Sequence, residues 1–196
     1  MADVASPPFG RGETYFAPNV TPDSTSGAHL EGREYWFEDA SGDLGRRVLC
    51  RIVRNASGIS LIPKRLVTFT SGKRGSVDGY ADVNSEQCCP VDDAYASSVR
   101  SNDLFYVIVE GPALIKTSLA GDATNVIAVG DFLQNATAAT SGATTAGRAR
   151  LALLDGATAV LAGQIRNIIG RALSAKTTAN TGESASSDVL VDVNRW

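Results

Sequence analysis

The stretch that decides the fold lies at the centre of the chain, where residues 104–135 read LFYVIVEGPALIKTSLAGDATNVIAVGDFLQN. Short runs rich in Val, Ile, Leu and Phe alternate here with turn residues such as Gly111-Pro112 and Gly130-Asp131. Apolar and β-branched runs of this length, punctuated by Gly, Pro and Asp, are typical of antiparallel strands. We therefore expect strands over residues 104–110, 113–117, 126–129 and 132–135, within a mainly β body that is a small β-barrel or a sandwich.

The C-terminal part of the chain continues this pattern. Residues 168–174 (IIGRALS) and 189–193 (VLVDV) are predicted to be the closing pair of strands, joined by a polar loop over residues 175–188. The Ala-rich residues 157–164 predict at most one short helix.

The first folded segment begins near residue 48 and admits two interpretations. Arg47, Arg51 and Arg54 could share one face of a helix, but β-branched residues close to the turn-like stretch 55–58 favour a strand and a hairpin. We choose strands over residues 48–54, 59–63 and 66–70. Residues 72–103 are predicted to be a long loop, so that the body divides into a hairpin region (35–71), this loop and a barrel-like core (104–196).

Residues 1–34 are predicted to form an extended N-terminal arm. The segment is rich in Pro, Gly, Ser, Thr and Asp and contains isolated aromatic residues at Phe9, Tyr15 and Phe16. A segment with so few apolar residues can be ordered by lying on another surface, with its aromatic side chains as anchors, or it can be a disordered tail. The aromatic cluster Tyr35-Trp36-Phe37 is expected to mark the point where the arm meets the body.

Charge excludes one class of function and suggests a docking surface. The 196 residues carry a formal net charge of -3, which gives the chain no field that would hold nucleic acid. No acidic residue occurs between Leu44 and Val77, although this segment contains eight cations. The segment could dock onto an acidic partner, or it could be a solvated strand face balanced by later acids such as Asp92 and Asp93.

The residues that would support catalysis or metal binding are few. The only histidine, His29, lies in the predicted arm, and the cysteines (Cys50, Cys88 and Cys89) have neither the number for a full disulfide set nor the spacing of a zinc site. They predict a reducing compartment, and nearby acids are expected to raise the pKa values of the Cys88-Cys89 pair. We expect no enzyme activity, no cofactor and no metal. No signal peptide and no membrane-spanning stretch is apparent, so we expect synthesis in a cytoplasm and no membrane partner.

The second half of the chain resembles the small capsid decoration, or cement, proteins of tailed phages. The matching features are Glu110-Gly111-Pro112-Ala113-Leu114, Val129-Gly130-Asp131-Phe132-Leu133 and Asn167-Ile168-Ile169-Gly170-Arg171-Ala172-Leu173 followed by the terminal strand. In that family a Gly-Asp turn and an Ile-Gly-x-Ala-Leu strand recur in a compact β-barrel. The resemblance covers residues 104–196.

This resemblance implies a structural protein of the virion that is made in the host bacterial cytoplasm. It would bind the major capsid protein on the outer surface of the phage head, form a homotrimer, bridge neighbouring capsomers and stabilise the shell. The residues that we expect to contact the capsid or a neighbouring copy are Phe9, Tyr15, Phe16, Tyr35, Trp36, Phe37, Arg47, Arg51 and Arg54. The alternative is a carbohydrate- or cell-surface-binding β module of a virion, because exposed aromatic residues on β proteins also serve that role.

Overall fold

The computed structural model describes residues 6–15, 27–38, 47–81, 87–117, 126–135, 147–152, 168–176 and 188–194. In these residues the chain is mainly β, as the sequence predicts, and none of its helices is long and apolar enough to cross a membrane. The elements in chain order are η1 (Ala28–Leu30), β1 (Glu34–Glu38), β2 (Arg47–Asn55), β3 (Leu66–Phe69), β4 (Ser76–Tyr80), β5 (Cys88–Pro90), β6 (Leu104–Lys116), β7 (Phe132–Asn135), β8 (Ala149–Leu151), β9 (Ile168–Ala172) and β10 (Asp188–Val193).

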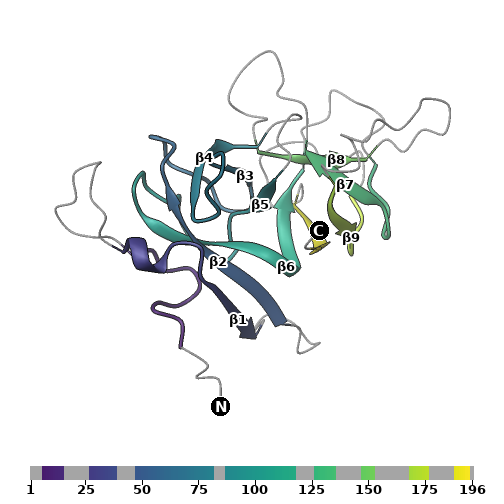
Figure 1. The fold of residues 1–196 in the computed structure, drawn as a ribbon. Helices are drawn as coiled ribbons and strands as arrows, with labels where there is room; N and C mark the ends of the chain where they lie inside the picture. Colours follow the sequence, from purple (N-terminus) through teal and green to yellow (C-terminus); the bar gives the residue numbers. More distant parts are fainter. Residues whose placement is uncertain are drawn as a thin grey trace.

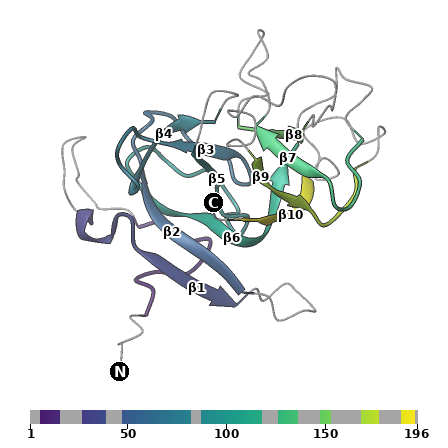
Figure 2. The same ribbon diagram turned by 45° about the vertical axis from the view of Figure 1, so that its right-hand side comes forward.

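One long strand, β6, organises the whole sheet (Figure 1). The strand order is β5-β3-β4-β2-β6-β10-β9-β7-β8, and β1 pairs with β2. Residues 104–110 of β6 pair with β2, whereas residues 111–116 pair with β10. The body therefore has an N-terminal lobe (β2–β5 with the first half of β6) and a C-terminal lobe (the second half of β6 with β7–β10), which Figure 2 shows side by side.

Each lobe curls back toward β6 without closing a barrel. Val91, just after β5, forms a single bridge with Val107, and Thr117, just after β6, forms one with Ala149 of β8. A single bridge is much less than a paired strand, so the body is sandwich-like rather than a closed barrel.

The predicted turn at Gly111-Pro112 is wrong, because β6 runs through it. Gly111 has a φ of 99°, and a Cβ there would lie 2.6 Å from the carbonyl oxygen of Arg47. Only glycine fits both this backbone conformation and this close approach. The glycine therefore bends β6 at the point where it passes from one lobe to the other, and β10 supplies the new pairing partner.

The predicted closing pair of strands is confirmed. β10 pairs antiparallel with β9, and Gly170 faces Val193 in the register. A Cβ at Gly170 would lie only 2.1 Å from the carbonyl oxygen of Asp192, so the strands meet where there is no side chain. The predicted strands at residues 104–110, 132–135 and 66–70 are also confirmed by β6, β7 and β3.

The hairpin that the sequence predicts after β2 is wrong. Residues 59–63 do not pair with β2 in a hairpin; Leu61 forms only an isolated bridge with Val99. The buried side chain of Asn55 donates hydrogen bonds to the carbonyl oxygens of Ile59 and Arg100, at 2.8 and 3.0 Å. The turn that follows β2 is therefore connected to the segment around Arg100 rather than forming a hairpin.

The predicted long loop over residues 72–103 contains β4 and β5, both of which pair with β3. These strands are short and interrupted by Gly79 and Pro90, which are signals of a loop in an isolated sequence. Residues 126–129 make an isolated bridge from Ile127 to Lys176 rather than a strand. The helix predicted at residues 157–164 lies outside the described residues, which contain the short 3-10 helix η1.

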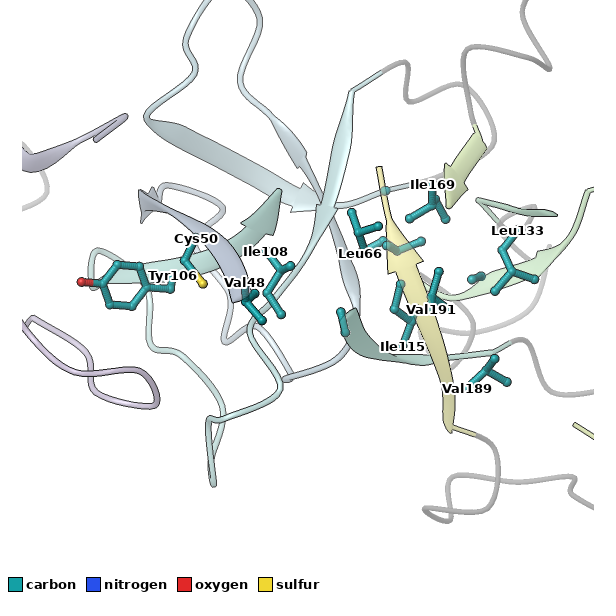
Figure 3. Close-up of a cluster of buried hydrophobic side chains, with 14 of the residues drawn as sticks. Val48, Cys50, Leu66, Tyr106, Ile108, Ile115, Leu133, Ile169, Val189 and Val191 are labelled. Carbon is teal, nitrogen blue, oxygen red and sulfur yellow. The ribbon is translucent and has the colours of Figure 1, made fainter. Parts of the chain in front are cut away.

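The strands β2 and β6 are buried on both faces, which explains their nearly continuous apolar sequences. One face contributes Val53, Phe105 and Val107 to the core of the N-terminal lobe. The other face belongs to a second apolar cluster that continues across β6 into the C-terminal lobe (Figure 3). That cluster contains Val48, Cys50, Leu66, Tyr106, Ile108, Ile115, Leu133, Ile169, Val189 and Val191 among others.

Candidate functional site

Residues 6–15 of the predicted arm lie on the chain's own N-terminal lobe. The ring of Phe9 packs 4.5 Å from that of Tyr106, and the Tyr106 hydroxyl donates a 2.9 Å hydrogen bond to the carbonyl oxygen of Phe9. The Tyr95 hydroxyl donates to the carbonyl oxygen of Glu13 at 2.9 Å, and Tyr15 bridges Leu104 at the start of β6. The arm is thus held by backbone as well as side-chain contacts.

A buried ion pair fixes the centre of the arm. Arg11 donates to both carboxylate oxygens of Asp92, with Nε–Oδ2 at 3.0 Å and Nη2–Oδ1 at 2.7 Å, and Nη2 also donates to Asp93 Oδ1 at 2.9 Å. The Asp92 side chain is 0% exposed and that of Arg11 is 15% exposed. Asp93 also accepts a 2.9 Å hydrogen bond from the backbone N–H of Leu114 on β6. The acids that the sequence analysis assigns to a solvated surface therefore hold the arm to both halves of the body.

Burial and the charge of Asp92 together determine the pKa values in this cluster. Burial by itself lowers the pKa of Arg11, but the hydrogen bond and charge of Asp92 outweigh it, so that the pKa is raised overall. Burial raises the pKa of Asp93 against the opposing hydrogen bond from Leu114. Burial also raises the pKa values of Tyr95 and Tyr106, so both hydroxyls stay protonated and able to donate to the arm.

Cys50 and Cys88 are poor nucleophiles because burial raises their pKa values. Burial, followed by the charge of Asp92, raises the pKa of Cys50. Burial raises the pKa of Cys88 to about 12, and its Sγ donates a 3.0 Å hydrogen bond to Asn135 Oδ1. The sequence analysis expects Asp92 and Asp93 to raise the pKa of Cys88, but in the structure these acids act on Cys50 instead. In the described part of the chain, no group of three or more His, Cys, Asp or Glu residues is placed to hold a metal ion.

A polar hollow separates the arm from the loop that precedes β6. It has a volume of about 290 Å³, and its lining includes Gly12, Thr14, Ser97, Arg100 and Asp103. The Asp103 side chain is buried, its Oδ1 has no hydrogen-bond partner, and burial raises its pKa. A side-chain hydrogen bond from Thr14 opposes this effect of burial and lowers the pKa of Asp103.

The predicted contact residues fall into two groups. Five have partners inside the chain. Tyr35 is buried, Phe37 packs 5.1 Å from Tyr106, Arg51 pairs with Glu34, and Arg54 pairs with Glu31 at 2.6 Å. Phe9 belongs to the same group through Tyr106. Three are exposed, namely Tyr15 (42%), Trp36 (53%) and Arg47. Phe16 lies outside the described residues.

The acid-free segment between Leu44 and Val77 is neutralised in part by acids from elsewhere in the chain. Glu31, Glu34 and Asp188 pair with Arg54, Arg51 and Lys64. These are not the acids that the sequence analysis proposes, because Asp92 and Asp93 are occupied by Arg11.

A basic patch (Arg33, Lys73 and Arg74) remains on the surface. The two segments that carry these cations lie side by side, because a Cβ at Gly75 would lie 2.9 Å from the N atom of Gly32. All three cations are exposed, and within the described residues none of them forms an ion pair; the neighbouring Asp78 on β4 is also exposed.

No family model, curated protein or solved structure matches this chain.

The sequence analysis does not identify an exposed apolar turn before β7. This turn patch (Val126, Val129 and Phe132) has side chains that are 47%, 66% and 38% exposed. The guanidinium of Arg171 lies over the Phe132 ring, 5.9 Å from its centroid. The signal in the sequence is the pair of large apolar residues on either side of Gly130-Asp131, because residues that flank the tip of a turn face solvent.

Proposed function

We propose that this chain is a non-enzymatic capsid decoration protein that binds the outer surface of a tailed-phage head and bridges neighbouring capsomers. The resemblance over residues 104–196 supports this function, and the described body is mainly β, as that family implies. The observation that carries the proposal is the basic patch (Arg33, Lys73 and Arg74), an exposed group of cations on a chain of net charge -3.

A concentrated positive surface on an acidic protein favours docking in one orientation. Lys73 and Arg74 lie in the turn between β3 and β4, and both side chains are exposed to a partner. Charge complementarity fixes orientation and speeds association more than it adds affinity. Many copies on a lattice would turn such weak contacts into firm attachment. The major capsid protein is therefore expected to present acidic groups at the docking position.

Binding to undecorated, expanded capsids tests the proposal. The wild-type chain should bind at a fixed number of copies per capsid, and binding should weaken between about 50 and 500 mM salt because screening shortens the range of the charges. The double variant Lys73→Glu/Arg74→Glu should lose binding, whereas the matched control Lys73→Arg/Arg74→Lys should retain it. Absence of binding by the wild-type chain would refute the function, and equal binding by both variants would refute the role of the patch.

A second candidate, a carbohydrate-binding module, is favoured by the exposed indole of Trp36. An aromatic face that is open to solvent can stack on the apolar face of a sugar ring. Glycan-array binding that is lost in Trp36→Ala, together with no binding to capsids, would select this function instead.

A further inference from the structure

We propose that copies of this chain associate head-to-tail, with the β1 edge of one copy seated on the turn patch of the next. The β1 edge is defined by Trp36 and Glu38, and the turn patch by Val126, Val129 and Phe132. This inference adds an interface to the proposed function but does not depend on the presence of a capsid.

The β1 edge offers an aromatic anchor on an open strand. Trp36 is 53% exposed, and its neighbours two positions away on the same face of the strand are Glu34 and Glu38. On one side β1 pairs with β2, and on its other side it has no strand partner in the part of the chain that the structure describes. Exposed tryptophan at an edge strand is a typical centre of a protein interface.

The turn patch, the proposed binding surface for the β1 edge, is held in one conformation by hydrogen bonds to β9. The backbone N–H of Gly130 donates to the carbonyl oxygen of Ala172, and the N–H of Ala172 donates to that of Asp131, both at 2.8 Å. Arg171 Nε donates to the carbonyl oxygen of Gly130 at 2.7 Å. The turn is therefore fixed to β9, so presenting Val129 and Phe132 to a partner costs little ordering entropy.

The charges that flank the two surfaces are complementary. Glu38 is exposed and faces the exposed Arg47 across the β1–β2 pair. Beside the turn patch, Arg171 is exposed and Asp131 is half-buried. When Trp36 lies on Val129 and Phe132, Glu38 can meet Arg171 while Arg47 meets Asp131. Each surface thus has an apolar centre that is flanked by acidic and basic groups, and these charges determine the orientation of the partner.

A symmetric pairing of β1 with itself is disfavoured by the sequence of the strand. Antiparallel pairing centred on Trp36 would place Glu34 of one copy opposite Glu38 of the other, and like charges directly opposite each other are destabilising. In both views the two surfaces lie far apart, with β1 at one end of the body and β7 at the other (Figures 1 and 2). A contact between different surfaces at opposite ends generates a closed ring or an open chain of copies.

Solution measurements on the full-length chain test the interface without any capsid. Both apolar surfaces are small, so we expect weak association, in the range of about 10–100 μM for an interface below roughly 1,200 Å². Sedimentation velocity of the wild-type chain from about 5 to 300 μM should show a concentration-dependent shift from monomer to a ring of a few copies. The variants Trp36→Ser and Val129→Asp, each confirmed as folded by circular dichroism, should remain monomeric when alone.

Mixing these two variants distinguishes head-to-tail association from a symmetric contact. The Val129→Asp chain keeps an intact β1 edge and the Trp36→Ser chain keeps an intact turn patch, so an equimolar mixture should form a dimer and nothing larger. The control Ile59→Ser, which removes an apolar side chain that is 49% exposed elsewhere, should associate as the wild type does. Recovery of association in Glu38→Arg/Arg171→Glu, after loss in each single variant, would identify the ion pair.

Three results would overturn the proposal. They are a wild-type chain that is monomeric at 300 μM, a Val129→Asp chain that still self-associates, and a mixture of the two variants that stays monomeric. None of these results concerns capsid binding, which is measured separately with undecorated capsids. Decoration by a chain that is monomeric in solution would leave the proposed function intact and remove only this interface.

Discussion

Replacing Arg11 by Ala should destabilise the whole body, because it leaves a buried charge without its partner. The Asp92 carboxylate is 0% exposed and accepts two hydrogen bonds from the Arg11 guanidinium, at 3.0 and 2.7 Å. Removing one partner of a buried ion pair typically costs about 3–5 kcal/mol. Asp93, the third member of the cluster, is 19% exposed and can be solvated, so we expect the lower end of this range.

Urea unfolding and thermal unfolding measure this loss directly. For a chain of about this length, 1 kcal/mol corresponds to a change in Tm of about 2–4 °C, so Arg11→Ala should lower Tm by roughly 6–12 °C. The control Arg11→Lys keeps the charge but loses the bidentate hydrogen bonding, and its Tm should lie between those of the wild type and Arg11→Ala. In the Arg11→Ala background, Asp92→Asn should recover part of the loss, because the remaining side chain is neutral.

A small effect would refute this reasoning. If Arg11→Ala costs less than about 1 kcal/mol, the magnitude typical of an exposed ion pair, Asp92 must be reached by water when the arm is altered. The arm would then be loosely attached rather than clamped. Hydrogen exchange at residues 9–15 separates the two cases, since a clamped arm is protected in the wild type and loses its protection in Arg11→Ala.

Two further predictions concern positions at which local packing is decisive. Gly170→Ala should destabilise the fold by about 1–3 kcal/mol, the usual cost of overpacking, since its Cβ would lie 2.1 Å from the Asp192 carbonyl oxygen. In urea unfolding, Gly10→Ala is the matched control and should stay within about 0.5 kcal/mol of the wild type. At pH 8 the thiols of Cys50 and Cys88 should resist iodoacetamide, because the raised pKa of Cys88, about 12 instead of 9.0, lowers its thiolate fraction about 1,000-fold. Mass spectrometry should detect labelling of both thiols only on unfolding or at strongly alkaline pH, and rapid labelling of the native chain at pH 8 would contradict their raised pKa values.

The sequence predicts strands well where the apolar pattern and the pairing are local. β9 and β10 are correctly predicted because their apolar runs are bounded by polar segments and pair antiparallel with each other. Gly111 shows the limit of this approach. A Gly-Pro pair is a turn signal in isolation, but here it bends a 13-residue strand. The second half of this strand pairs with β10, which begins 72 positions after Lys116.

The candidate site is harder to predict, because its decisive contacts join residues far apart in the chain. Arg11 and Asp92 are 81 positions apart, and neither has a local feature that distinguishes it from a solvated charge. The eight cations between Leu44 and Val77 form a uniform run in the sequence, yet the fold brings Glu31, Glu34 and Asp188 to three of them. Charge runs therefore identify the segment from which a docking surface can come. The residues that remain available for a partner are determined by which acids the tertiary structure brings to that segment. Among the described residues they include Arg47 and the pair Lys73 and Arg74, which Arg33 joins from the end of the arm.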